Sequence, residues 1–199
     1  MKKETEKPKI LLHSCCGPCS TAVVERLIED YQVTIFFYNP NITDREEYEK
    51  RKDAQIRFLH QYNLNRKEIE AIRLIEGDYY PKSFYQAVKN LEEIPEGGAR
   101  CTACFSLRLN RTAEEAKDRG FLWFGTTLSV SPHKNHSVIT KIGLELANEK
   151  GLNYLEDDFK KKAGFQRSIE LSRKYGLYRQ NYCGCEFSNR ERGIKWQVN

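Results

Sequence analysis

The chain has no apolar run that approaches the ~18 residues of a membrane-spanning helix, so we expect no membrane partner. Its charged leader, residues 1–8, runs directly into a strand-like segment and lacks the small-residue cleavage site of a signal peptide. These absences predict a cytoplasmic protein with a polar, flexible leader. Because cytoplasmic thiols stay reduced, its seven cysteines point to a metal or to catalysis rather than to disulfide scaffolding.

The chain also has no internal repeat, no low-complexity segment and no linker long enough to divide it. We therefore expect one domain over residues 9–199. Ten lysines and arginines against three glutamates give the last 40 residues, 160–199, a charge of +7, although the whole chain carries only +5. A basic segment on a near-neutral body favours a polyanionic partner, but a solvated helix face would explain the same charge.

Apolar runs alternate with helical patterns along the chain. Strands are predicted at Ile10–His13, Val33–Tyr38, Ile69–Ile75 and Leu122–Gly125. Helices are predicted at Thr21–Asp30, with Ser20 as its cap, from Thr43 or Asp44 to Tyr62, and at Pro81–Asn90, Cys101–Gly120, His136–Lys150 and Ala163–Tyr175. A loop over Gly176–Asn189 follows the last helix. This alternation predicts an α/β fold with an open, doubly wound, mainly parallel sheet and a helical carboxyl-terminal extension that carries a cysteine loop. In such sheets the site lies beyond the carboxyl ends of the strands.

The cysteines form three tight groups: Cys15, Cys16 and Cys19; Cys101 and Cys104; Cys183 and Cys185. Closely spaced thiolates can share one metal centre, which scattered core cysteines could not do. Two thiolates from each of the first two groups would satisfy a [4Fe–4S] cluster, and zinc is the competing interpretation. The third group could be a readily reduced dithiol pair or could hold another metal.

Five segments in this order resemble the QueH family of epoxyqueuosine reductases: HSCCGPCS, FFYNPNI, RCTACFSLRL, FGTTLSVSPHKN and YRQNYCGCEFS. The resemblance runs from about Lys9 to Asn189, and the one departure is Gly17, where the family often has alanine. It implies reductive removal of the epoxide oxygen of epoxyqueuosine at the wobble position of tRNA, which consumes two electrons and two protons and gives queuosine.

Residue by residue, the resemblance assigns Cys15, Cys16, Cys101 and Cys104 as ligands of a [4Fe–4S] cluster and Cys183 and Cys185 as the catalytic, redox-active pair. An additional iron is allowed, for which Cys19 is a possible ligand. The resemblance also implies a fold like that of the adenine-nucleotide hydrolase-like (HUP) group, the anticodon loop of tRNA as partner and an unidentified electron donor. HSCCGPCS stands where the ATP-using members of that group have a glycine-serine ATP loop, so we expect this protein to use no ATP.

The reaction also needs a proton donor, for which the residues offer Tyr182, Glu186, His13 and His133. For His13, at the end of its strand, a structural role is the favoured interpretation. Three other functions stay open: a tRNA sulfurtransferase, which would normally need the missing ATP loop, a zinc-stabilised RNA-binding module, and a general thiol–disulfide oxidoreductase.

Overall fold

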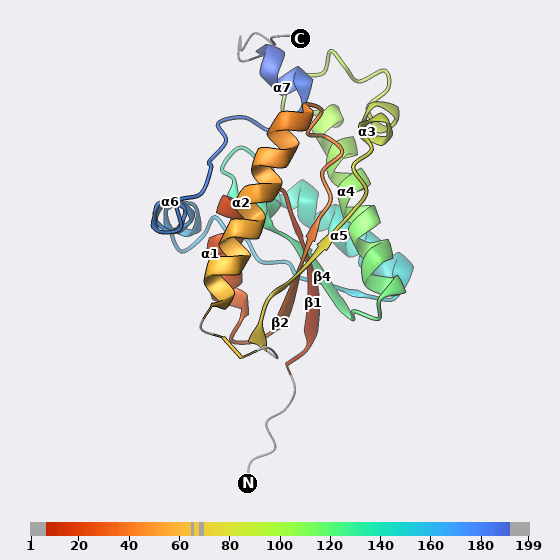
Figure 1. The fold of residues 1–199 in the computed structure, drawn as a ribbon. Coiled ribbons are helices and arrows are strands. Elements are labelled where there is room, and N and C mark those ends of the chain that lie inside the picture. Colours follow the sequence, from red (N-terminus) through yellow and green to blue (C-terminus); the bar gives the residue numbers. More distant parts are fainter. Residues whose placement is uncertain (1–6, 65, 68–69, 192–199) are drawn as a thin grey trace.

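The computed structural model describes residues 7–64, 66–67 and 70–191, and one parallel sheet forms its centre (Figure 1). The strands are β1 (Lys9–Ser14), β2 (Gln32–Phe37), β3 (Arg73–Glu76), β4 (Trp123–Thr126) and β5 (Asn153–Tyr154). They lie in the order β3-β2-β1-β4-β5, and every neighbouring pair is parallel. The predicted open, doubly wound α/β sheet is confirmed, and its arrangement is consistent with the HUP group. The strand order reverses between β1 and β4, where sheets of this kind bind ligands.

Helices cover both faces of the sheet (Figure 1). They are α1 (Gly17–Leu27), α2 (Arg45–Asn63), α3 (Pro81–Ala87), α4 (Ala99–Asp118), α5 (His136–Lys150), α6 (Gly164–Lys174) and α7 (Glu186–Glu191), with a short 3₁₀ helix at Thr127–Val130. Side chains of α1 and α2 pack with Ile10 and Leu12 on one face, whereas side chains of α4 and α5 pack with Leu11 on the other. The alternation of β1 therefore divides the core in two.

Some element bounds differ from the prediction, and each difference has a local cause. Helix α1 begins at Gly17 rather than Thr21, because Pro18 fits the first turn and Cys16 takes the N-cap position that was assigned to Ser20. The two-residue β5 and the six-residue α7 are too short for periodicity to reveal, and α7 occupies part of the predicted loop. Helix α5 has both predicted ends, since Gly151 closes it with a φ of 70°.

Three predictions fall partly outside the described residues. Of the leader, residues 1–6 lie outside them, and so do Arg192 and Lys195 of the basic segment. The predicted start of the third strand at Ile69 also lies outside, and the observed strand begins at Arg73. Within the described ranges, none of the helices has the length and apolar character needed to cross a bilayer.

We predict that Asp44→Ala lowers the free energy of unfolding by ~0.5–2 kcal/mol. The Asp44 carboxylate caps α2, since it accepts from the backbone N–H groups of Glu46 at 2.7 Å and Glu47 at 3.2 Å. Urea unfolding measures the change. Asp44→Asn keeps an acceptor and should lose much less, and Asp53→Ala, at an exposed position inside the same helix, should stay within about 0.5 kcal/mol of the parent. Equal losses in all three variants would contradict the cap.

Candidate active site

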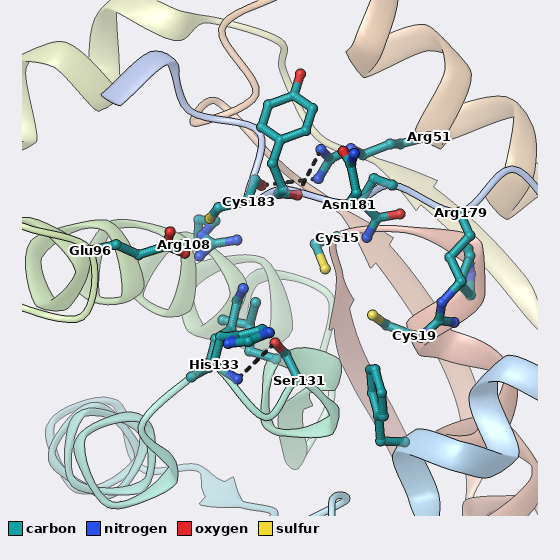
Figure 2. Close-up of a pocket in the computed structure, with 16 residues that line it drawn as sticks. Cys15, Cys19, Arg51, Glu96, Arg108, Ser131, His133, Arg179, Asn181 and Cys183 are labelled. Atoms are coloured by element: carbon teal, nitrogen blue, oxygen red, sulfur yellow. Dashed lines mark hydrogen bonds between the residues drawn. The ribbon is translucent and has the colours of Figure 1, made fainter. Parts of the chain in front are cut away.

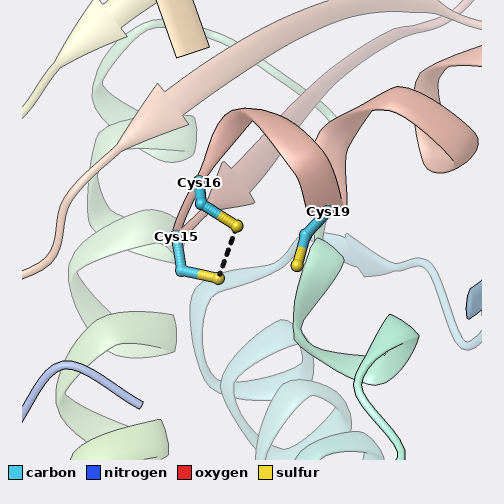
Figure 3. A group of neighbouring side chains, drawn as sticks. All are labelled: Cys15, Cys16 and Cys19. Carbon is cyan, nitrogen blue, oxygen red and sulfur yellow. Dashed lines mark hydrogen bonds between the residues drawn. The ribbon is translucent and has the colours of Figure 1, made fainter. Parts of the chain in front are cut away.

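The turn between β1 and α1 gathers three cysteines. Cys15 and Cys16 follow β1 directly, and Cys19 lies in the first turn of α1. Their sulfur atoms all lie within 4.8 Å of one another, and the Sγ atoms of Cys15 and Cys16 are 3.9 Å apart (Figure 3). Three thiolates at this separation could hold a metal.

Hydrogen bonds from neighbouring segments fix the shape of this turn. The hydroxyls of Ser14 and Ser20 both donate to Oε1 of Gln55 on α2, each at 2.7 Å. Asn39, in the loop after β2, donates to the backbone carbonyl of Ser14 at 2.8 Å. Ser20, the predicted cap, therefore ties α1 to α2. The loop after β2 supports the turn through Asn39 but contributes no residue to the pocket described below.

Gly17 brings this turn close to α2. A Cβ atom at this position would lie 2.4 Å from the carbonyl oxygen of Ala54, a backbone atom that cannot swing aside. The glycine thus permits the close contact between α1 and α2.

The three sulfurs of the turn differ electrostatically. Hydrogen bonds from Cys16 and Cys19 lower the pKa of Cys15 well below its ordinary value. Burial raises the pKa of Cys16 to about 12, and the hydrogen bond with Cys15 raises that of Cys19. Nε2 of Gln180 donates to Sγ of Cys16 at 2.9 Å. The turn therefore favours a thiolate at Cys15, with neutral thiols beside it.

The second group lies at the start of α4. The helix begins at Ala99 rather than at the predicted Cys101, so Cys101 lies in its first turn and Cys104 in its second. The backbone N–H of Gly97 donates to Sγ of Cys101 at 3.2 Å, so the amide that reaches this sulfur comes from before the helix rather than from its first turn. Burial raises the pKa of both thiols, that of Cys104 to about 11. Both sulfurs therefore need a cation or a metal to become thiolates at neutral pH.

The third group separates into one sulfur in a pocket and one in the core. Cys183 lines the pocket described next, whereas Cys185 is buried in an apolar cluster with Phe84, Cys104 and Phe187. A hydrogen bond from Cys185 lowers the pKa of Cys183, and the positive charges of nearby lysine and arginine side chains lower it further. The pKa of Cys185 is raised in turn.

A cavity of about 210 Å³ lies where β1 and β4 end, and it joins segments that are far apart in the sequence (Figure 2). Its lining comprises Cys15, Pro18, Cys19, Arg51, Glu96, Arg108, Leu128, Ser131, His133, Lys134, Phe165, Arg179, Gln180, Asn181, Tyr182 and Cys183. Four lysine and arginine side chains line the cavity, whereas Glu96 is the single carboxylate that the described residues contribute to it. This site pocket is therefore suited to a negatively charged or electron-rich occupant.

Arg108 and Lys134 connect the three cysteine groups. Burial opposes the charge of Arg108, but the sulfurs of Cys104, Cys183, Cys15 and Cys101 raise its pKa overall. Burial likewise opposes the charge of Lys134, and the sulfurs of Cys183, Cys15 and Cys19 raise its pKa. Members of all three groups thus lie close enough to the same two cations to interact with them.

The donor set fits a thiolate-bound iron–sulfur centre. All seven cysteines are free, and soft thiolates are the ligands that such centres use. Nη2 of the buried Arg108 has no hydrogen-bond partner among the described residues, although it is a cationic donor whose pKa the cysteine sulfurs raise. An anionic, sulfur-rich centre would supply the missing partner. Which four cysteines would bind it stays a prediction.

Two of the four candidate proton donors line the site pocket. They are Tyr182 and His133, and burial raises the pKa of Tyr182, which keeps its hydroxyl protonated. His13 is fully buried beneath the turn, where its Nε2 donates to the carbonyl of Tyr38 at 3.0 Å and its Nδ1 pairs with the hydroxyl of Thr126 at 2.9 Å. Burial lowers the pKa of His13 to about 3, so it is a neutral structural residue.

Glu186, the fourth candidate, is absent from the pocket lining. It begins α7 and accepts from Arg190 at 3.1 Å. Sequence reasoning overlooked Arg51, Arg108 and Phe165. Arg108 carried a detectable signal, since it follows Cys104 by one helical turn and Cys101 by two and therefore shares their helix face.

Known proteins of one kind match almost the whole chain. A family model described as "Epoxyqueuosine reductase QueH" matches residues 10–191. Relatives named epoxyqueuosine reductase QueH are 42% identical in Staphylococcus epidermidis, over all of this chain and 84% of the relative, and 40% identical in Streptococcus pyogenes, over 97% and 75%. The relative in Thermotoga maritima is 38% identical over 94% of this chain and 93% of its own length. The chain is therefore a member of the QueH family of epoxyqueuosine reductases, a family of oxidoreductases.

Proposed function

We propose that this chain reduces epoxyqueuosine in tRNA to queuosine. The observation that carries the proposal is that the three cysteine groups are joined in space at the switch point of the sheet. Cys15, Cys19 and Cys183 line one pocket together with Arg108 and Lys134, and Cys104 packs in one cluster with Cys185. The reaction replaces an epoxide by an alkene and releases the oxygen as water, which requires two electrons and two protons. A dithiol that becomes a disulfide supplies both, so the pair Cys183 and Cys185 balances one turnover.

We propose Cys15, Cys16, Cys101 and Cys104 as the ligands of a [4Fe–4S] cluster. A cluster held there would supply electrons one at a time. Cys19 lies within 4.8 Å of the sulfurs of Cys15 and Cys16, so it is available to ligate an additional iron. Arg108 would balance the negative charge of the thiolates, and Gln180 would orient Sγ of Cys16 through its hydrogen bond of 2.9 Å.

The modified nucleoside would enter the site pocket after leaving the base stack of the anticodon loop. RNA-binding proteins stack such bases on aromatic rings and on arginine planes. Phe165 and Arg179 offer this combination, since both line the pocket and Cζ of Arg179 lies 5.1 Å from the ring centroid of Phe165. Arg179 is held in place by Ser168 and Ser172, whose oxygens lie 3.3–3.4 Å from its guanidinium nitrogens.

Exposed basic side chains near α6 would bind the phosphates of the anticodon stem and loop. Lys161, Lys162, Arg173 and Lys174 are exposed. Arg167 is less available, because its guanidinium makes two hydrogen bonds of 2.8 Å with Glu25. We expect the affinity for tRNA to fall as the salt concentration rises, as counterion release requires. Tyr182 or His133 would protonate the leaving oxygen, because both line the pocket.

We predict that anaerobically prepared protein, given a reductant, converts epoxyqueuosine-containing tRNA to a product lighter by one oxygen atom. Cys183→Ser and Cys185→Ser should each abolish this conversion, because neither variant can form the disulfide. Mass spectrometry of the digested tRNA measures the product, and a filter-binding assay should show unchanged tRNA affinity. Full reduction by either variant would remove the dithiol from the proposal, and ATP-dependent gain of sulfur would point to a sulfurtransferase instead.

We predict that Phe165→Ala weakens tRNA binding by about tenfold or more, since stacking of one base contributes ~1–3 kcal/mol. Phe165→Tyr keeps a stacking ring and should bind nearly as the parent does. The control is Tyr80→Ala, which removes an exposed aromatic ring that lies outside the pocket lining. Titration of each variant with epoxyqueuosine-containing tRNA measures the dissociation constant. An equal effect of the Phe165 and Tyr80 substitutions would contradict the stacking role.

A further inference from the structure

We propose that Arg51 is a positioning residue for the redox pair: it holds the segment around Cys183 so that this sulfur faces the pocket, and Cys183 rather than Cys185 exchanges with an incoming thiol. This inference rests on the proposed role of the pair in epoxyqueuosine reduction. It is carried by a chain of hydrogen bonds that runs from α2 to the cysteine loop.

Arg51 is almost fully buried, with 1% of its side chain exposed, and it binds two consecutive backbone carbonyls of the cysteine loop. Its Nη1 donates to the carbonyl of Cys183 at 3.0 Å, and its Nη2 donates to the carbonyl of Tyr182 at 3.2 Å. Its Nε donates to Oε1 of Glu47, one turn earlier in α2, at 2.6 Å. A planar guanidinium can make these three bonds at once, which a lysine ammonium cannot reproduce with the same geometry.

Glu47 extends the same network to the beginning of the loop. Its Oε2 accepts from the hydroxyl of Tyr178 at 2.7 Å, while its Oε1 accepts from Arg51. The carboxylate is therefore bound on both sides, and the loop is tied to α2 at Tyr178 and again at Tyr182 and Cys183. The guanidinium of Arg51 also lies over the ring of Tyr182, with Cζ 5.2 Å from its centroid.

Gly184, between the two cysteines, is fixed as well. It has a φ of 108°, which favours glycine, and a Cβ here would lie 2.9 Å from Ile42 and 3.1 Å from Nη1 of Arg51. Its carbonyl accepts from the backbone N–H of Thr43 at 3.3 Å. Because this residue cannot rotate freely, the orientation of Cys183 relative to Cys185 is set by the backbone.

The two sulfurs consequently have different access. Cys183 contributes to the pocket lining, whereas Cys185 has 6% of its surface exposed and packs with Phe84 and Phe187. A thiolate that enters the pocket would attack Sγ of Cys183 in the disulfide form. The S–S bond would break, Cys185 would leave as a thiolate and take up a proton, and a mixed disulfide would remain on Cys183. A second thiol of the same dithiol donor would then release Cys183 and close its own disulfide.

The first test uses oxidised glutathione and chains with a single member of the pair. Cys185→Ser should form a mixed disulfide at Cys183, located by peptide mass mapping, whereas Cys183→Ser should leave Cys185 unmodified. Arg51→Gln in the Cys185→Ser chain should slow the modification of Cys183 about tenfold, because hydrogen bonds to a charged group are lost. Arg51→Lys should recover part of the rate. The matched control is Arg45→Gln on the same helix, whose exposed ion pair with Glu49 lies outside the pocket.

The second test measures the reduction potential of the pair, which a role in general stability would not change. Equilibration of the parent chain, Arg51→Gln and Arg45→Gln with glutathione redox buffers should give a shifted midpoint only for Arg51→Gln. If Arg51→Gln fails to fold, Tyr178→Phe removes the bond to Glu47 alone and should give a smaller shift in the same direction.

Equal modification of Cys183 and Cys185, or equal rates and midpoints for the Arg51 and Arg45 variants, would overturn the proposal. Neither test uses tRNA or iron. If oxidised glutathione modifies Cys183 selectively but the protein leaves epoxyqueuosine unreduced, the proposed function is refuted and the positioning role of Arg51 stands.

Discussion

Buried positive charge at the carboxyl edge of the sheet is the constraint on which the site depends. Arg108 lies in the interior of the chain, where an unpaired guanidinium would be strongly unfavourable. Cysteine sulfurs from all three groups raise its pKa, and its Nη2 has no hydrogen-bond partner in the described part of the chain. A thiolate at Cys15 or Cys183 would stabilise this cation, and the cation in turn lowers the pKa of both thiols. The site therefore requires the cysteines and the cations together.

The fold supplies this arrangement through topology rather than through local sequence. Because β1 and β4 are parallel neighbours, the turn after β1 and the loop after β4 meet at one edge, where they bring Cys15 beside Lys134. Helix α4 begins near the same edge and contributes Cys101, Cys104 and Arg108. The segment before α7 closes the pocket from the far end of the chain, and α2 holds it through Arg51. Elements from both faces of the sheet thus contribute to a single pocket.

Much of this could be predicted from the sequence, since its signals are local. The alternation of apolar runs and helical patterns predicted the parallel sheet, and Asp44 and Gly151 marked helix ends that the structure has. The grouping of the cysteines indicated a redox or metal site, although its ligands stay a prediction. The sequence did not single out Arg51, because α2 carries many charged residues and an arginine among them is typical of a solvent-exposed helix face. Its burial depends on a loop about 130 residues later, and no periodicity within α2 encodes that contact.

The iron and acid-labile sulfide content of anaerobically purified protein shows whether these cysteines hold an iron–sulfur centre. We expect a brown protein with about four or more iron atoms per chain, as one [4Fe–4S] cluster requires. Cys16→Ser or Cys104→Ser should lose most of that iron, whereas Cys19→Ser should keep the cluster. A colourless protein that contains zinc and no sulfide would show that the cysteines hold no iron–sulfur cluster.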